Sequence, residues 1–148
     1  MELDSGSPRE TLDIGRRLAR ILRAGDVLLL AGRLGSGKTL LVAGIAEGLG
    51  VEDQVTSPSF VLVREYDGFL RLVHADVYRI GSVNEFRDLE LVDAAADGVL
   101  AVEWGDVVAN AVPDHLLVDI GITGAEMRRL TFTPMGSWSA RSLEELAQ

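Results

Sequence analysis

The chain has 148 residues, 47% of them hydrophobic and 25% charged, and a formal net charge of −9 at pH 7. This length fits one domain, residues 1–148, that is large enough to bury a core. It contains no cysteine, which excludes disulfides, thiol catalysis and zinc–thiolate sites, and its acidic balance argues against a protein that binds nucleic acid by itself.

The amino-terminal residues resemble neither a secretion signal nor a membrane anchor. Residues 1–7 carry no basic segment and no apolar segment, and no apolar run approaches membrane-spanning length. We therefore expect a cytoplasmic protein without membrane contact. Only two histidines are present, so a histidine-based metal cluster is not expected either.

The first predicted helix begins at the capping pattern Ser7-Pro8-Arg9-Glu10, with proline at the first helical position. Gly25 is expected to end it. Its buried side is predicted to consist of Leu12, Leu18, Ala19 and Leu22. A basic stripe also lies on this helix, which is usually a solvated face, and it is formed by Arg16, Arg17, Arg20 and Arg23.

A strand over residues 26–31 is followed by Gly32-Arg33-Leu34-Gly35-Ser36-Gly37-Lys38-Thr39 and by a helix from Lys38 to about Leu49, closed by Gly50. The octapeptide matches the phosphate-binding P-loop pattern G-x-x-x-x-G-K-[ST] in the strand-then-helix context that the pattern requires. Its lysine is the single lysine among 14 basic residues.

Phosphate binding explains the residue types of the P-loop. Glycines let the backbone wrap around a phosphate with its N–H groups pointing inward, next to the positive end of the following helix. Lys38 supplies a compact ammonium that can bridge the β- and γ-phosphates, and Thr39 supplies the hydroxyl that P-loop proteins place on Mg²⁺. A glycine-rich turn without function is the alternative interpretation.

Two β-rich runs follow, at residues 60–66 and 69–75, and Asp67-Gly68 between them is a two-residue hairpin signal. Ser82-Val83-Asn84-Glu85 repeats the capping pattern and predicts a short helical stretch. We expect its apolar side to carry Leu89, Leu91 and Val92.

Residues 99–102 read as a fully buried strand that ends on an acid, Glu103. A second hairpin is predicted at about 115–122 and 127–133, and a closing helix at 139–147. Strands and helices that alternate around a P-loop predict an α/β fold, a three-layer P-loop NTPase sandwich. The two hairpins make its central sheet mixed, parallel plus antiparallel.

Two acids occupy positions suited to a Mg²⁺-nucleotide. Asp76 follows the apolar run 70–75, and Glu103 follows 99–102. Mg²⁺ takes oxygen ligands, and carboxylates at the ends of neighbouring strands can supply them beside a P-loop. Alternatively, each acid is a strand-end residue that faces water.

Four segments together resemble the TsaE family in order and spacing, over nearly the whole chain. They are the P-loop, Ser57-Pro58-Ser59-Phe60 leading to Glu65-Tyr66, His74-Ala75-Asp76-Val77-Tyr78-Arg79, and Val102-Glu103-Trp104-Gly105. The family consists of small bacterial ATPases required for making threonylcarbamoyladenosine in tRNA. The resemblance implies a Mg²⁺-dependent ATP hydrolase that binds ATP and Mg²⁺ and acts on a complex of TsaD and TsaB, meeting tRNA only through that complex.

The resemblance also implies site residues. Thr39, Asp76 and Glu103 would hold Mg²⁺, directly or through water, and Lys38, Asp76 and Glu103 would serve catalysis, Glu103 by orienting the attacking water. Ser59 lies in the segment that resembles the family's switch-like loop, where most members have threonine, and Thr11 would approach the adenine. The phosphates would be cradled by Leu34, Gly35, Ser36, Gly37, Lys38, Thr39 and Leu40.

Several of these residues have structural interpretations that stay open. His74 is either a hydrogen-bonded strand histidine or a functional residue. Tyr78 and Arg79 either serve the site or brace the sheet and cap a helix. Trp104 either packs or serves nucleotide sensing or partner contact.

A P-loop is also found in proteins with three other functions. A regulatory GTPase would need Asn-Lys-x-Asp and Asp-x-x-Gly motifs, which this sequence lacks. A small P-loop kinase would need an acceptor site and a lid, for which the chain has little room. An assembly factor that binds ATP without hydrolysing it cannot be separated from an ATPase by sequence.

Overall fold

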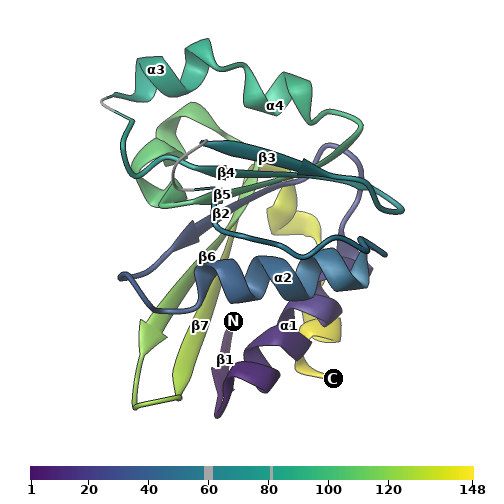
Figure 1. The fold of residues 1–148 in the computed structure, drawn as a ribbon, viewed down its shortest axis with the longest axis vertical. Helices are drawn as coiled ribbons and strands as arrows, with labels where there is room; N and C mark the ends of the chain where they lie inside the picture. The colour runs from purple at the N-terminus through teal and green to yellow at the C-terminus, as the bar shows by residue number, and fades with distance from the viewer. Residues whose placement is uncertain (59–61, 81) are drawn as a thin grey trace.

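The computed structural model describes residues 1–58, 62–80 and 82–148 (Figure 1). Its strands form one seven-stranded sheet in the order β1-β7-β6-β2-β5-β4-β3. The central strands β4, β5, β2 and β6 run parallel, whereas β3, β7 and β1 pair antiparallel at the two edges. The strand bounds are β1 Glu2–Ser5, β2 Val27–Ala31, β3 Val63–Tyr66, β4 Arg71–Asp76, β5 Gly98–Glu103, β6 His115–Ile122 and β7 Arg128–Met135.

Helices cover both faces of the sheet, as Figure 1 shows, so the predicted three-layer α/β sandwich with a mixed sheet is confirmed. One face carries α1 (Pro8–Ile21) and α2 (Lys38–Gly48), and the other carries α3 (Val83–Asp88) and α4 (Leu91–Ala94). Three 3-10 helices complete the described chain, η1 (Gly105–Ala111), η2 (Gly136–Ala140) and η3 (Glu144–Ala147).

Strand β2 contributes side chains to both halves of the core, which lie on opposite faces of the sheet. Leu28 and Leu30 point into the cluster beneath α1 and α2, whereas Val27 and Leu29 point into the cluster beneath α3. This alternation follows from the two-residue period of a strand, and burial on both faces explains why the run is apolar throughout. The strand is thereby held rigidly up to Ala31, where the P-loop begins.

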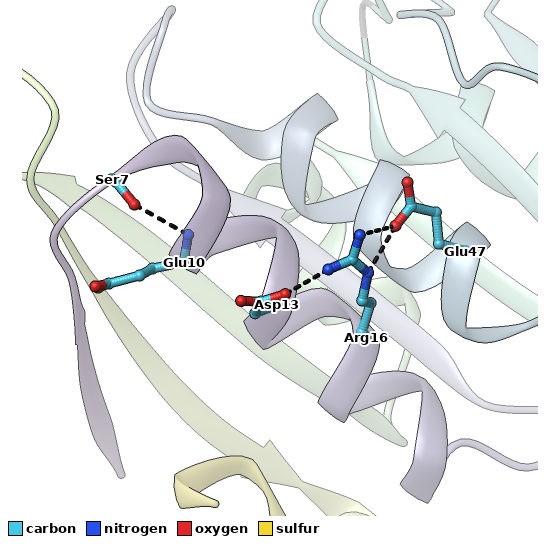
Figure 2. Close-up of polar contacts among 5 residues, drawn as sticks. All are labelled: Ser7, Glu10, Asp13, Arg16 and Glu47. Carbon is cyan, nitrogen blue, oxygen red and sulfur yellow. Dashed lines mark hydrogen bonds and ion pairs between the residues drawn. The ribbon is translucent and has the colours of Figure 1, made fainter.

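Helices α1 and α2 pack closely through glycines. A Cβ atom on Gly15 would lie 2.5 Å from the Leu41 carbonyl oxygen and 2.9 Å from Gly44 Cα, closer than side chains come to backbone. The predicted N-cap is present, because Ser7 Oγ accepts from the Glu10 N–H (Figure 2). The packing of α1 against α2 fixes the start of α2 beside the P-loop.

The basic stripe of α1 is partly engaged. Arg16 binds Asp13 on its own helix, and its Nε donates across to Glu47 Oε2 on α2 at 2.7 Å (Figure 2). Arg17 donates to the Leu146 carbonyl in η3.

Helix α1 ends at Ile21, before Gly25. Its buried side contains Ile14 and Gly15, while Leu12 is only half-buried.

The first hairpin differs from the prediction. Strands β3 and β4 pair antiparallel from Val63↔Ala75 to Tyr66↔Leu72, so the connection is longer than the two residues Asp67-Gly68. The Phe69 N–H donates to the Leu49 carbonyl at 2.6 Å, which draws the turn towards the end of α2 and out of the ladder. The beginning of the first predicted strand, residues 60 and 61, lies outside the described residues.

The predicted helical stretch after Ser82 is interrupted. Ser82 Oγ accepts from the Glu85 N–H as expected, but α3 ends at Asp88 and Glu90 adopts a left-handed backbone before α4 begins. Leu89 and Val92 are exposed, at 40% and 38% of their surface, so the prediction that they form the apolar side is wrong. Phe86 and Leu91 pack into the core there.

The predicted closing helix is wrong as well. Residues 139–147 form parts of two 3-10 helices, η2 and η3, separated by Arg141 in an extended conformation. The Arg141 guanidinium stacks 3.7 Å from the Trp138 ring centroid and its Nη1 donates to Asp26 at 2.7 Å. These tertiary contacts outweigh the helix propensity of a short segment.

Strand β1 has no counterpart among the predicted elements. It pairs with β7 at the edge of the sheet, from Glu2↔Thr131 to Ser5↔Arg128, and so places the start of the chain beside the second hairpin. That hairpin, β6 with β7, and the buried strand β5 ending on Glu103 are confirmed. Within the described residues, no helix has the length and apolar character needed to cross a membrane.

Candidate functional site

The P-loop joins β2 to α2 in the predicted geometry. Gly35 and Gly37 adopt positive φ angles of 80° and 108°, which a side chain at either position would strain. Gly37 is the N-cap of α2, and no side chain of the described residues caps that helix. The first N–H groups of α2 therefore point towards the loop, as in sites that bind phosphate.

Lys38 lies inside this loop. Its Nζ donates to the carbonyls of Gly32 at 2.5 Å and Arg33 at 3.1 Å, and it lies 3.9 Å from the centroid of the Trp104 ring. Burial lowers the pKa of Lys38, and the charges of Glu103, Asp76 and Asp106 oppose that shift. The ammonium is thus held within the loop by backbone carbonyls that a phosphate oxygen could replace.

Asp76 and Glu103 end the parallel strands β4 and β5 and stand directly beside each other in the ladder. Both are nearly buried, with 5% and 4% of their surface exposed. Thr39 Oγ1 donates to Glu103 Oε2 at 2.8 Å, and the Tyr78 N–H donates to Asp76 Oδ1 at 2.8 Å. The structure therefore brings the end of the P-loop into contact with the end of β5.

These groups surround one cavity of about 320 Å³. Its wall contains most of the predicted residues: Leu34, Gly35, Gly37, Lys38, Thr39 and Leu40 from the loop and α2, Asp76 and Glu103 from the sheet, and also Ser57 and Trp104. Tyr78 and Arg79 line an adjoining cavity of about 220 Å³ together with Trp104. Ser59, the predicted switch-loop residue, lies outside the described residues.

The donor set fits Mg²⁺ bound to a nucleotide. A hydroxyl and two carboxylates converge, all of them oxygen donors, and Mg²⁺ commonly takes one or two carboxylates while waters and phosphates complete its shell. In the described part of the chain no group of three or more acidic or histidine side chains is arranged to hold a metal alone.

Thr11 and the loop residue Ser36 line a different cavity. Both line a second cavity of about 220 Å³, together with Gly35, Gly37, Leu40, Glu126 and Arg128. Thr11 is buried, and its hydroxyl lies 2.7 Å from Ser5 Oγ, so it is paired within the fold. The sequence predicted both residues at the nucleotide; Ser36 belongs to the loop and Thr11 lies beside it, and both line this second cavity and not the one that contains Asp76 and Glu103.

Two contacts were not predicted. His74 is fully buried, and its Nε2 lies 2.5 Å from Glu103 Oε2. The two-residue strand period could have indicated this, because His74 and Asp76 share a face of β4. Arg128 binds the P-loop from the second hairpin. No local signal could have indicated that contact, since the partners are far apart in sequence.

Comparisons with known proteins agree with this geometry. A family model described as threonylcarbamoyl adenosine biosynthesis protein TsaE matches residues 5–130. A tRNA threonylcarbamoyladenosine biosynthesis protein TsaE from Streptomyces coelicolor is 44% identical over 146 residues, covering 91% of this chain and 98% of that protein. The TsaE protein from Bacillus subtilis is 40% identical over 145 residues, covering 96% and 90%.

A solved structure also resembles this fold. The crystal structure of Bacillus subtilis YdiB superposes with a TM-score of 0.80 at 35% identity, covering 99% of this chain and 93% of that chain. The family model spans most of the residues, and the relatives align over nearly their whole length. The chain therefore belongs to the TsaE family of threonylcarbamoyl adenosine biosynthesis proteins.

Proposed function

We propose that this protein binds Mg²⁺-ATP in the P-loop cavity and hydrolyses it on a complex of TsaB and TsaD during tRNA threonylcarbamoyladenosine modification. One observation carries the ATPase part of this proposal. The P-loop threonine, Thr39, is hydrogen-bonded to Glu103, whose neighbour in the sheet is Asp76. This arrangement links a phosphate cradle to two carboxylates, as phosphoryl-transfer sites require.

The chain's own groups have distinct tasks in this mechanism. The N–H groups from Leu34 to Thr39 and the positive end of α2 bind the phosphates. Lys38 leaves the Gly32 and Arg33 carbonyls and places its charge between the β- and γ-phosphates. Its buried position strengthens that attraction, because the surroundings screen charge less than bulk water does.

Thr39 and Asp76 would hold Mg²⁺ directly or through water. The bound ion would neutralise charge that develops on the phosphates. Glu103 is held in place by Thr39 and His74 and is suited to orient the attacking water or to share the metal. The Thr39 hydroxyl can keep donating its hydrogen to Glu103 while its oxygen lone pairs would face the metal, so this hydrogen bond orients the hydroxyl for ligation.

Slow turnover without a partner follows from the composition of the cavity. No arginine lines the P-loop cavity within the described residues, and Arg79 lines only the adjoining one. Phosphoryl-transfer sites that lack such a cation gain turnover when a partner supplies the missing group. This supports stimulation by TsaB and TsaD.

The test is an ATPase assay of the purified protein with Mg²⁺, first alone, then with tRNA, then with TsaB and TsaD. The proposal expects slow hydrolysis alone, little change with tRNA, and strong stimulation by the two proteins. Stimulation by tRNA alone, without response to TsaB and TsaD, would contradict the proposed partners. ATP binding without turnover under every condition would indicate a non-hydrolysing assembly factor.

A further inference from the structure

We propose that Arg128 is a positioning residue that holds the P-loop in its phosphate-binding shape from outside the loop; this inference rests on the proposed function. Arg128 is the first residue of β7 and is half-buried. Its Nε donates to the Ser36 carbonyl at 2.9 Å and its Nη2 to the Gly35 carbonyl at 3.3 Å. Both acceptors belong to the P-loop.

The same guanidinium also binds the tip of its own hairpin. Its Nη1 lies 2.8 Å from the Met127 carbonyl, 3.1 Å from that of Gly124 and 3.4 Å from that of Ala125. All three guanidinium nitrogens are therefore used, in the planar fork that arginine alone provides. Arg128 joins two segments that are otherwise separate in the sequence, the P-loop and the β6–β7 turn.

The direction of these hydrogen bonds determines where the loop's N–H groups point. In a trans peptide the C=O and the N–H of the next residue point in opposite directions. Arg128 donates to the Ser36 and Gly35 carbonyls from outside the loop. The N–H groups of the same two peptides, those of Gly37 and Ser36, therefore face the inside of the loop. The Ser36 N–H is used within the loop, where it donates to the Arg33 carbonyl at 3.0 Å, so the Gly37 N–H is the one that this arrangement presents to a phosphate.

The loop needs this support because its glycines leave the backbone free to adopt other conformations. Gly35 and Gly37 can adopt several backbone conformations, and a Cβ atom on Gly35 would have no neighbour within 4 Å. Packing against side chains therefore does not hold this part of the loop. The Arg128 charge also polarises the Ser36–Gly37 peptide group, which strengthens the Gly37 N–H as a donor to a phosphate.

Calorimetric titration of ATP and ADP into the full-length protein tests the proposal. Arg128→Gln should weaken the binding of both nucleotides about tenfold, the loss expected for one charge-assisted hydrogen bond. Arg128→Lys should also bind more weakly than the wild type, because one ammonium cannot span both segments. The matched control is Arg129→Gln, which removes the neighbouring arginine, an exposed residue paired with Asp4, and should leave binding unchanged.

Amide hydrogen exchange without nucleotide gives a second readout. Arg128→Gln and Arg128→Lys should speed exchange at Ser36 and Gly37 while β2 and β5 keep their protection, whereas a general loss of structure would speed exchange everywhere. Unchanged nucleotide binding in the Arg128 variants, full recovery by Arg128→Lys, or equal weakening by Arg129→Gln would overturn the inference and leave the ATPase proposal intact. Failure of the wild-type protein to bind ATP would overturn both.

Discussion

Lys38 is the residue on which the proposed chemistry depends most. It is the chain's single lysine, and it lies between the loop carbonyls and the Trp104 ring, close to the place where phosphates would bind. An arginine could not replace it easily, because a planar guanidinium is too wide for the same cradle. The surrounding acids keep a positive charge favourable there although burial lowers its pKa.

Replacing this lysine gives the first prediction. Lys38→Ala should reduce transition-state stabilisation by about 2–4 kcal/mol, on the scale of losing one preorganised donor. The measurement is kcat/KM for ATP, in the presence of TsaB and TsaD if the basal rate is too slow. Thermal unfolding of the same variant serves as the control for folding. Near-normal turnover in a folded variant would contradict the P-loop assignment.

The two carboxylates give a second prediction at this scale. Asp76→Asn and Glu103→Gln keep the size of each side chain and an oxygen that can accept the Tyr78 or Thr39 hydrogen bond. Each should therefore cost about 1 kcal/mol of folding stability or less while it impairs Mg²⁺-dependent hydrolysis. Turnover as a function of Mg²⁺ concentration and the thermal midpoint are the two measurements.

The outcomes of that experiment separate the open interpretations. Loss of stability with persisting turnover would show that these acids only end their strands. A Glu103→Gln variant that binds ATP but does not turn it over would support a water-orienting role for Glu103. A higher Mg²⁺ requirement in both variants would support metal ligation.

At the level of elements, the close contact of α1 with α2 positions the start of α2. Gly15 lies against the backbone of α2, and Arg16 reaches across to Glu47 (Figure 2). Alanine favours a helix over glycine by roughly 1 kcal/mol, so propensity alone predicts that Gly15→Ala stabilises the protein. The contact distances predict the opposite.

We expect Gly15→Ala to destabilise the protein by about 1–3 kcal/mol, because the added methyl group meets backbone atoms that cannot rotate away. Urea unfolding monitored by circular dichroism measures the effect. The matched control is Gly121→Ala in β6, where the nearest atom to an added Cβ is the Arg129 carbonyl oxygen at 3.8 Å. Equal stability of the two variants would show that the helices move apart at little cost.

For the whole molecule, the net charge of −9 disfavours direct contact with nucleic acid. Non-specific affinity for nucleic acid comes mainly from cations that neutralise phosphates, and several of this chain's arginines are already paired with acids, such as Arg71 with Asp97 and Arg129 with Asp4. Contact with tRNA should therefore pass through other proteins.

The corresponding prediction concerns tRNA alone. Fluorescence anisotropy with labelled tRNA at physiological salt should give a dissociation constant weaker than about 10 μM. A salt titration is the control, because weak binding that arises from non-specific attraction between exposed arginines and tRNA phosphates should disappear as the salt concentration rises. Submicromolar binding by the isolated protein would contradict the proposal that tRNA is met only through a complex.

Much of this molecule could be predicted from the sequence because the signals are local. The β2 strand, the P-loop and the start of α2 depend on an apolar run and on the glycines and Lys-Thr pair of the loop pattern, all within about one turn or strand of each other. The positions of Asp76 and Glu103 follow likewise, since parallel strands of a buried sheet end at the same edge.

Other features were decided only by tertiary structure, because their partners are distant in the chain. β1 exists through its pairing with β7, and the last residues form short 3-10 turns because Arg141 is bound to Trp138 and Asp26. Arg128 reaches the P-loop only once β6 and β7 have folded back beside it. Residue types and spacing therefore determined which chemistry this chain can support, whereas long-range packing decided which side chains hold that chemistry in place.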